Sequence, residues 1–124
     1  MSAFAFSNPL PTLLAAAFML ASLNCAAAGN RCAPHRGSAS LVSGSVFDGP
    51  PQESVELMPD DLRPSASALD STWDVAAIYA AGRKVYLVCR YSGSRRPVTV
   101  KIKGKVKRCA LRTHAGRPPE LGCR

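Results

Sequence analysis

Few residues of this chain have the side chains and the spacing that catalysis or metal binding requires. The two histidines, His35 and His114, lie outside any nucleophile motif such as Gly-x-Ser-x-Gly and outside any metal motif such as His-Glu-x-x-His. Asp60 and Asp61 are adjacent, and adjacent side chains on an extended chain point apart. We therefore expect a protein that is not an enzyme and that holds no metal or cofactor. The enzymatic alternative is a cryptic site that uses the two histidines.

Residues 1–28 have the features of a secretory signal. Leu13–Leu23 is an uninterrupted apolar run, and Ala26–Ala28 fits the small-residue rule for signal cleavage. The run is too short to span a bilayer, which needs about 20 residues. We expect a mature domain of residues 29–124 that is periplasmic or secreted and has no transmembrane segment. A lipoprotein lipidated at Cys25 is the alternative, although the residues before this cysteine fit a lipobox poorly.

The cysteines indicate how such a small domain is stabilised. Cys25 falls in the expected signal, which leaves an even number of cysteines in an exported chain and predicts two disulfides. Free buried thiols are the alternative, and a zinc site is disfavoured because no Cys-x-x-Cys pair occurs. We favour Cys109–Cys123 across a last hairpin, with Cys32–Cys89 holding the N-terminal segment. The other pairing considered joins Cys89 to Cys109 and Cys32 to Cys123.

The charges are unevenly placed along the expected mature domain, which carries the whole formal charge of +8. Seven of the eight acidic residues lie between Asp48 and Asp74. In contrast, thirteen of the sixteen lysines and arginines lie from Arg83 onward. The C-terminal half therefore predicts a cationic surface, which favours acidic partners.

The most strand-like stretch of the chain is Lys84–Tyr91, which is rich in β-branched and aromatic residues and lacks Gly and Pro. Before it, Ala80–Gly82 predicts a three-residue hairpin loop with Gly in the left-handed conformation. This loop would pair Thr72–Tyr79 with the strand and place Trp73 opposite Cys89 on a core face. The stretch is therefore expected to be the central strand of a meander.

A second turn at Ser92–Pro97 predicts a third strand, Val98–Lys107, in which apolar residues and lysines alternate. If Tyr91 faces Val98, the apolar residues of this third strand extend the same core face. The two turns thus agree on one face of an antiparallel sheet. This agreement supports the meander.

The remaining segments predict a short strand, a long loop and a last hairpin. Ser45–Phe47 is the short strand, and residues 60–71 are expected to form a loop without a helix. Cys109–Thr113 and Glu120–Arg124 are expected to form the hairpin. The predicted fold is an all-β, small, disulfide-bonded antiparallel meander or sandwich domain with long N-terminal loops.

Two surface features are candidates for binding a partner. Lysines at alternate positions of the third strand would project from one face about 6.7 Å apart. They could be a solvated face or a charged edge that prevents sheet pairing, or a stripe that docks an acidic protein or an anionic envelope component. No nucleic acid is expected, because no aromatic platform alternates with the lysines.

The second surface feature is the turn at Asp48–Pro51, which is expected to be rigid and could insert into a partner. The candidate partner-binding residues are Tyr86, Arg90, Lys101, Lys103, Lys105, Asp48, Gly49, Pro50 and Pro51.

Several short motifs occur in a distinctive order across residues 32–123. They are Cys32-Ala33-Pro34, Val46-Phe47-Asp48-Gly49-Pro50-Pro51, Leu57-Met58-Pro59-Asp60, Trp73, Tyr86-Leu87-Val88-Cys89-Arg90-Tyr91 and Cys109. In these motifs the chain resembles a group of small exported proteobacterial proteins without an established activity. One departure is a shorter stretch between Cys32 and Val46. The resemblance implies a periplasmic disulfide-bonded β-domain and brings no catalytic residues with it.

These observations favour a periplasmic binding or inhibitor protein. The most concrete form of this hypothesis is an immunity protein or inhibitor directed against a cell-wall-active enzyme. Its partner would be an acidic protein that contacts the lysine stripe and the Asp48–Pro51 loop. The alternative hypothesis is an envelope component that binds anionic lipid or polysaccharide through the lysine-rich strand face.

Overall fold

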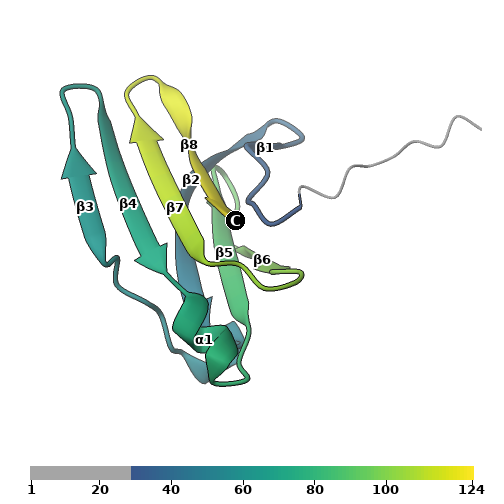
Figure 1. Cartoon of the computed structure of the whole chain (residues 1–124). Coiled ribbons are helices and arrows are strands. Elements are labelled where there is room, and N and C mark those ends of the chain that lie inside the picture. The colour runs from purple at the N-terminus through teal and green to yellow at the C-terminus, as the bar shows by residue number, and fades with distance from the viewer. Residues whose placement is uncertain (1–28) are drawn as a thin grey trace, which may run out of the picture.

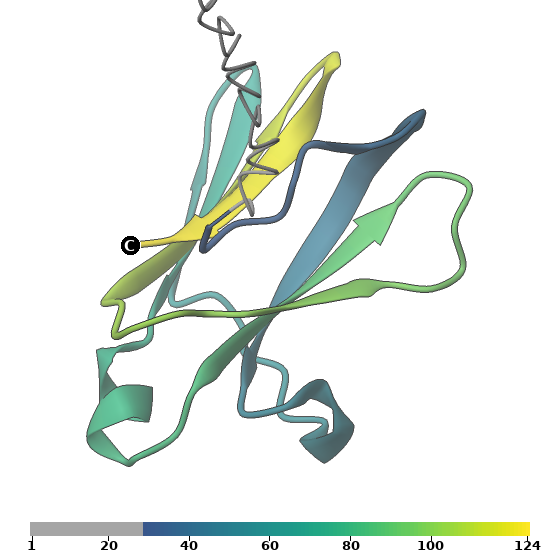
Figure 2. The same cartoon turned by 90° about the vertical axis from the view of Figure 1, so that its right-hand side faces the viewer.

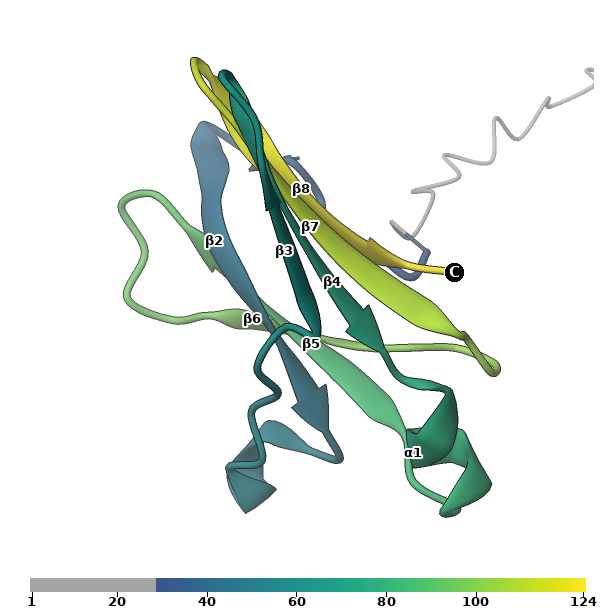
Figure 3. The ribbon, with the colours of Figure 1, turned by 60° about the vertical axis from the view of Figure 1, so that its left-hand side comes forward.

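The computed structural model describes residues 29–124, and the expected secretory signal, residues 1–28, lies outside the described residues. The described chain forms two antiparallel sheets of four strands each, which lie as two layers (Figures 1 and 3). The first sheet has the order β1 (His35–Arg36), β2 (Ala39–Asp48), β5 (Val85–Tyr91) and β6 (Val98–Lys101). The second has the order β3 (Asp61–Pro64), β4 (Ala68–Asp74), β7 (Arg108–His114) and β8 (Arg117–Cys123). The expected all-β, disulfide-bonded antiparallel class is confirmed.

Strand β5 is a central strand of the first sheet, where it pairs with β2 and β6. Its register with β6 differs by two residues from the prediction, because Cys89 and not Tyr91 lies opposite Val98. After Cys89 the chain keeps pairing with β2, and Ser92 donates its N–H to Ser40 O, so the connection to β6 is longer than predicted. A shift of two residues preserves the side-chain alternation, so the predicted core face is retained.

The predicted hairpin between Thr72–Tyr79 and β5 is wrong. Strand β4 belongs to the second sheet, where it lies between β3 and β7 and places Trp73 opposite Cys109. The expected hairpin loop is replaced by a short helix, α1 (Ala76–Ala80), which is followed by Gly82 at φ +73°. A glycine in the left-handed conformation ends a helix as readily as it closes a hairpin, and alanine favours the helix.

Two further expectations about the N-terminal half are corrected. Residues 60–71 are not a loop, since they form β3 and the first half of β4. The expected short strand at Ser45–Phe47 is the end of the ten-residue strand β2, so the N-terminal loops are shorter than predicted. After β2, the 3₁₀ helix η1 (Pro51–Glu53) lies at the same end of the sheets as α1 (Figure 2).

The predicted third strand is shorter than expected, because β6 ends at Lys101. Residues 102–107 cross from the first sheet to the second, and they include Gly104 at φ +71°. The alternation persists along this crossover, where Ile102 and Val106 are buried and the intervening lysines are exposed. The last hairpin is confirmed as β7 and β8, and the prolines of β8 are tolerated because β8 is the last strand of its sheet.

The core lies between the two sheets. Leu41, Val46 and Leu87 of the first sheet and Trp73 and Leu121 of the second are buried together. The indole N–H of Trp73 donates to Leu57 O at 3.0 Å, so its polar atom is satisfied inside the molecule. The tryptophan is therefore a core residue, as expected, although it lies beside a different cysteine from the predicted one.

The disulfides follow the favoured pairing. Cys32–Cys89 joins the N-terminal segment to β5, and Cys109–Cys123 joins β7 to β8. Both bridges help to close the two-layer core, since all their sulfurs belong to buried or half-buried residues. Neither helix of residues 29–124 is long and apolar enough to cross a membrane.

Candidate functional site

A groove of about 1020 Å³ lies along the outward face of the second sheet and extends to the N-terminal segment at residues 30–34. The strand registers place Thr72 opposite Ala110, and Ala110 opposite Gly122, so three small residues lie side by side on β4, β7 and β8. Asp61 of β3 continues this row at one end, and Arg31 bridges to Gly122 at the other. Small side chains leave the sheet surface low at this row, which forms the floor of the groove. We call this feature the charged groove, because charged rows flank its floor on both sides.

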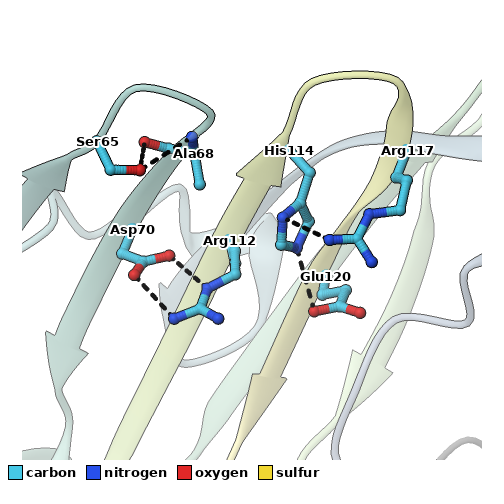
Figure 4. Close-up of polar contacts among 7 residues, drawn as sticks. All are labelled: Ser65, Ala68, Asp70, Arg112, His114, Arg117 and Glu120. Atoms are coloured by element: carbon cyan, nitrogen blue, oxygen red, sulfur yellow. Dashed lines mark hydrogen bonds and ion pairs between the residues drawn. The ribbon is translucent and has the colours of Figure 1, made fainter.

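One flanking row alternates in charge across all four strands. The registers place Arg63, Asp70, Arg112 and Glu120 opposite one another in that order. Arg112 donates two hydrogen bonds to Asp70, from Nε to Oδ1 at 2.6 Å and from Nη2 to Oδ2 at 2.9 Å (Figure 4). These hydrogen bonds hold the pKa of the Asp70 carboxyl below its ordinary value and raise the pKa of Arg112. This row therefore forms one wall of the charged groove, and the Arg112–Asp70 pair within it is held in place before any ligand binds.

The other flanking row contains Asp74, Arg108 and Arg124, which are neighbours across β4, β7 and the chain end. The Asp74 carboxylate accepts the Ala76 N–H at 3.2 Å, and the Asp60 carboxylate accepts the Asp74 N–H at 2.6 Å. Within residues 29–124, no salt bridge engages the guanidinium of Arg108 or Arg124. With two guanidinium groups and one side-chain carboxylate, Arg108, Arg124 and Asp74 give this row an excess of positive side-chain charge, and the two guanidinium groups are free of salt bridges within the described residues.

The two histidines do not form a common site. His35 lies in β1 of the first sheet, where its Nδ1 is 3.3 Å from Ser40 Oγ. His114 lies in β7 of the second sheet, with Nδ1 3.1 Å from Arg117 Nη2 and Nε2 3.5 Å from Glu120 Oε2 (Figure 4). Each histidine is thus engaged with residues of its own sheet.

The structure brings together only part of the predicted lysine surface. Lys101 lies opposite Tyr86, and Arg90 shares their outward face, where its Nη1 donates to Ser45 Oγ at 3.0 Å. Lys103 and Lys105 are exposed but lie beyond the strand, on the crossover. There the Asn30 amide accepts the Lys103 N–H at 2.8 Å and donates to Lys103 O at 3.0 Å. A flat stripe of lysines on one strand is therefore wrong, although a basic surface remains.

The loop Asp48–Pro51, which its composition predicts to be rigid, is tied to Arg83 by an ion pair at Asp48. Arg83 clamps it, with Nε 2.6 Å from Asp48 Oδ1 and Nη2 2.6 Å from Glu53 Oε2. Gly49 has φ +80°, and a Cβ there would meet both Arg83 and Glu53. A small hollow of about 250 Å³ connects Gly49 and Pro50 with Tyr86. The loop therefore lies next to one end of the outward face of the first sheet.

Sequence reasoning missed the charged groove, although the sequence contains a signal for it. Asp70, Thr72 and Asp74 alternate with inward residues of β4, and Arg108, Ala110 and Arg112 do the same in β7. Both strands therefore show a charged–small–charged pattern at every second residue. This pattern is visible only once these segments are known to be neighbouring strands.

The described residues contain no group of three or more His, Cys, Asp or Glu side chains that could hold a metal ion. The fold defines a disulfide-bonded domain of two packed antiparallel β-sheets. The family model described as Type VI secretion system Tli immunity protein matches residues 35–124, and the chain belongs to this family. Searches of curated proteins and of solved structures each found no match.

Membership of this family confirms the expected class, an immunity protein that is not an enzyme. It also implies that the chain binds a cognate toxin effector of a type VI secretion system. Tli proteins neutralise lipase effectors and not cell-wall enzymes. The expectation of a cell-wall-active target is corrected accordingly.

Proposed function

We propose that this protein is the periplasmic antidote to a lipase effector of a type VI secretion system, which it neutralises by direct binding. The single observation that carries this proposal is the family match over residues 35–124. The two disulfides support the periplasm as the site of action, because such bonds form and persist in oxidising compartments.

The physical properties of the domain suit an inhibitor that binds without chemistry. Its two disulfides cross-link the chain, and Arg83 ties Asp48 to Glu53, so these contacts favour a surface that is ordered before the partner arrives. Such pre-organisation lowers the entropy cost of binding. The formal charge of +8 attracts an acidic effector surface and speeds association at low ionic strength.

Protection of living cells tests the proposal directly. The cognate lipase effector is directed to the periplasm of a bacterial host, with and without the full chain. We expect the chain to restore survival and, as a purified protein, to inhibit phospholipid hydrolysis at a one-to-one ratio. A variant without residues 2–28 is the control, and it should fail to protect because it stays in the cytoplasm. Unchanged killing in the presence of the exported, oxidised chain would overturn the proposal.

A second candidate function is favoured by the exposed lysines that follow β5. In the described chain, no salt bridge engages Lys101, Lys103, Lys105 or Lys107. We propose that this basic surface, with Tyr86 and Arg90 beside it, docks the protein on anionic lipid headgroups. A lysine near an anionic membrane contributes about 1 kcal/mol to binding, so the surface has enough charge for a reversible interaction.

Vesicle sedimentation tests the docking candidate. Wild-type protein should sediment with phosphatidylglycerol vesicles at low salt and not with neutral vesicles. Reversal of three lysines, K101E/K103E/K105E, should weaken this binding by on the order of 100-fold. Absence of wild-type binding to anionic vesicles at low salt would reject the candidate, and it would leave the antidote proposal unaffected.

A further inference from the structure

The charged groove has the dimensions of a docking site for one polypeptide segment. Its two walls are four residues apart along β4, from Asp70 to Asp74, and equally along β7, from Arg112 to Arg108. At about 3.3 Å per residue, the walls stand about 13 Å apart. The floor crosses neighbouring strands that are about 4.8 Å apart, so several residues of an extended segment or loop tip can lie along it.

The charged side chains of the two walls differ in the hydrogen bonds and salt bridges that they make within the chain. In the first wall, Arg112 and Asp70 bond each other through two hydrogen bonds. In the second wall, the carboxylate of Asp74 accepts a backbone N–H, whereas no salt bridge within residues 29–124 engages Arg108 or Arg124. A ligand that enters the groove therefore meets cationic donors that are ready to bond. A carboxylate matches these donors best, because guanidinium and carboxylate can form two parallel hydrogen bonds.

We propose that the charged groove is the docking site for a loop of the effector that carries a carboxylate. The loop lies across the Thr72–Ala110–Gly122 floor, and its carboxylate bonds Arg108 and Arg124. The inference rests on the proposed function, since it names the surface through which the antidote binds its effector. It assigns binding to the second sheet and not to the lysine surface or the Asp48–Pro51 loop of the first.

Two kinds of substitution test this assignment. Ala110→Trp fills the floor without disturbing the core, because Ala110 is exposed and tryptophan is well tolerated in strands. The pair Arg108→Glu and Arg124→Glu reverses the charge of the second wall. The matched controls lie on or beside the first sheet: Thr99→Trp adds an indole to an exposed strand position, and R95E/R96E, in the connection between β5 and β6, removes the same amount of positive charge. Circular dichroism and the melting temperature verify the fold of each variant.

The readout is the Kd for the purified cognate lipase effector, measured by calorimetry with the mature, oxidised protein. We expect Ala110→Trp and R108E/R124E each to raise the Kd by on the order of 100-fold, because buried charge pairs and central contacts dominate such interfaces. The controls should stay within about threefold of wild type, since charges outside the contact act mainly on the association rate.

The outcomes separate the groove from the function. If the wild-type protein does not bind the effector, the proposed function fails, and the groove loses its partner with it. If the wild type binds and the groove variants bind equally well, the docking site is wrong while the antidote function stands. Loss of binding by Ala110→Trp alone would keep the floor as a contact and reject the carboxylate on Arg108 and Arg124.

Discussion

The two sheets of this protein divide its structure into a part stabilised by apolar residues and a part patterned by charge. Strand β5 of the first sheet buries five of its seven residues, whereas β4 of the second buries only Ser71 and Trp73. The outward face of β4 instead carries Asp70, Thr72 and Asp74, which line the charged groove. The difference shows that a strand with few buried residues can still be central to a sheet when its neighbours on both sides pair with it.

The disulfides provide the strongest test of this division, because each one serves a different part. Cys32–Cys89 closes a long loop onto the first sheet, with a sequence separation of 57, and Cys109–Cys123 spans 14 residues inside the second. The loop-entropy model gives about 4 kcal/mol for the longer loop and about 3 kcal/mol for the shorter one. Replacing each pair by serine should lower the free energy of unfolding in that order.

Urea unfolding of the two serine variants measures both losses. We expect C32S/C89S to unfold at a lower midpoint concentration of urea than C109S/C123S. Wild-type protein under reducing conditions should have a lower midpoint than either variant. The reverse order would mean that the bridge within the second sheet limits the stability of the whole domain. In that case the charge-patterned sheet would be the weaker of the two layers.

The contact between Gly44 and Leu121 tests how tightly the two sheets are joined. Gly44 lies in β2, and a Cβ at this position would meet the Leu121 side chain of β8 across the core. Its φ is not in the left-handed region, so alanine is penalised only by packing. Gly44→Ala should destabilise the fold by about 1–3 kcal/mol, as overpacking of a core does.

A double-mutant cycle isolates this contact. Gly44→Ala should cost less in a Leu121→Ala background, because the smaller side chain leaves room for the added methyl group. The coupling free energy from four chemical denaturation curves measures the difference. Equal costs in both backgrounds would show that the sheets can move apart at this point, and that the two layers are less dependent on each other than their shared core indicates.

The apolar part of the fold was predictable from the sequence, and the reasons are physical. Val85–Tyr91 was predicted to be a strand and is one in the structure, because its β-branched and aromatic residues favour strands. The Cys109–Cys123 bridge of the second sheet was favoured over one alternative, because the expected last hairpin brings these two cysteines close together. In both cases the information is local, since the strand is recognised from its own residues and the two cysteines are only 14 residues apart.

The charge-patterned part was not predictable, because its information is spread along the chain. Strand β4 pairs on one side with β3 and on the other with β7, which follows about forty residues later, and not with β5, the next strand along the chain. The Ala80–Gly82 segment is compatible with both a hairpin loop and a helix end, and only the crossing between sheets selects the helix. The charged groove depends on these long-range pairings, so its residues could not be grouped from spacing alone.

The last and smallest effect concerns the pH dependence of the pre-organised wall. The hydrogen bonds from Arg112 lower the pKa of the Asp70 carboxyl in the folded protein. Because the folded value lies below the unfolded one, the charged pair adds stability that is complete above about pH 4, the ordinary range of an aspartate. That contribution is lost as the pH falls through the lower folded pKa. Side-chain carboxyl NMR should therefore show Asp70 titrating below the ordinary aspartate range.

Two variants distinguish the causes of this shift and relate it to the groove. Arg112→Met should return the Asp70 midpoint toward its ordinary value, whereas Arg63→Met should move it less, since Arg63 makes the smaller contribution. Both arginines lie in the same wall of the groove, so a general loss of positive charge would affect the two variants alike. If the two midpoints coincide, the Arg112–Asp70 pair is not held together in solution. The wall would then be a set of independent charges, and the second sheet would resemble the unpaired lysine surface of the first.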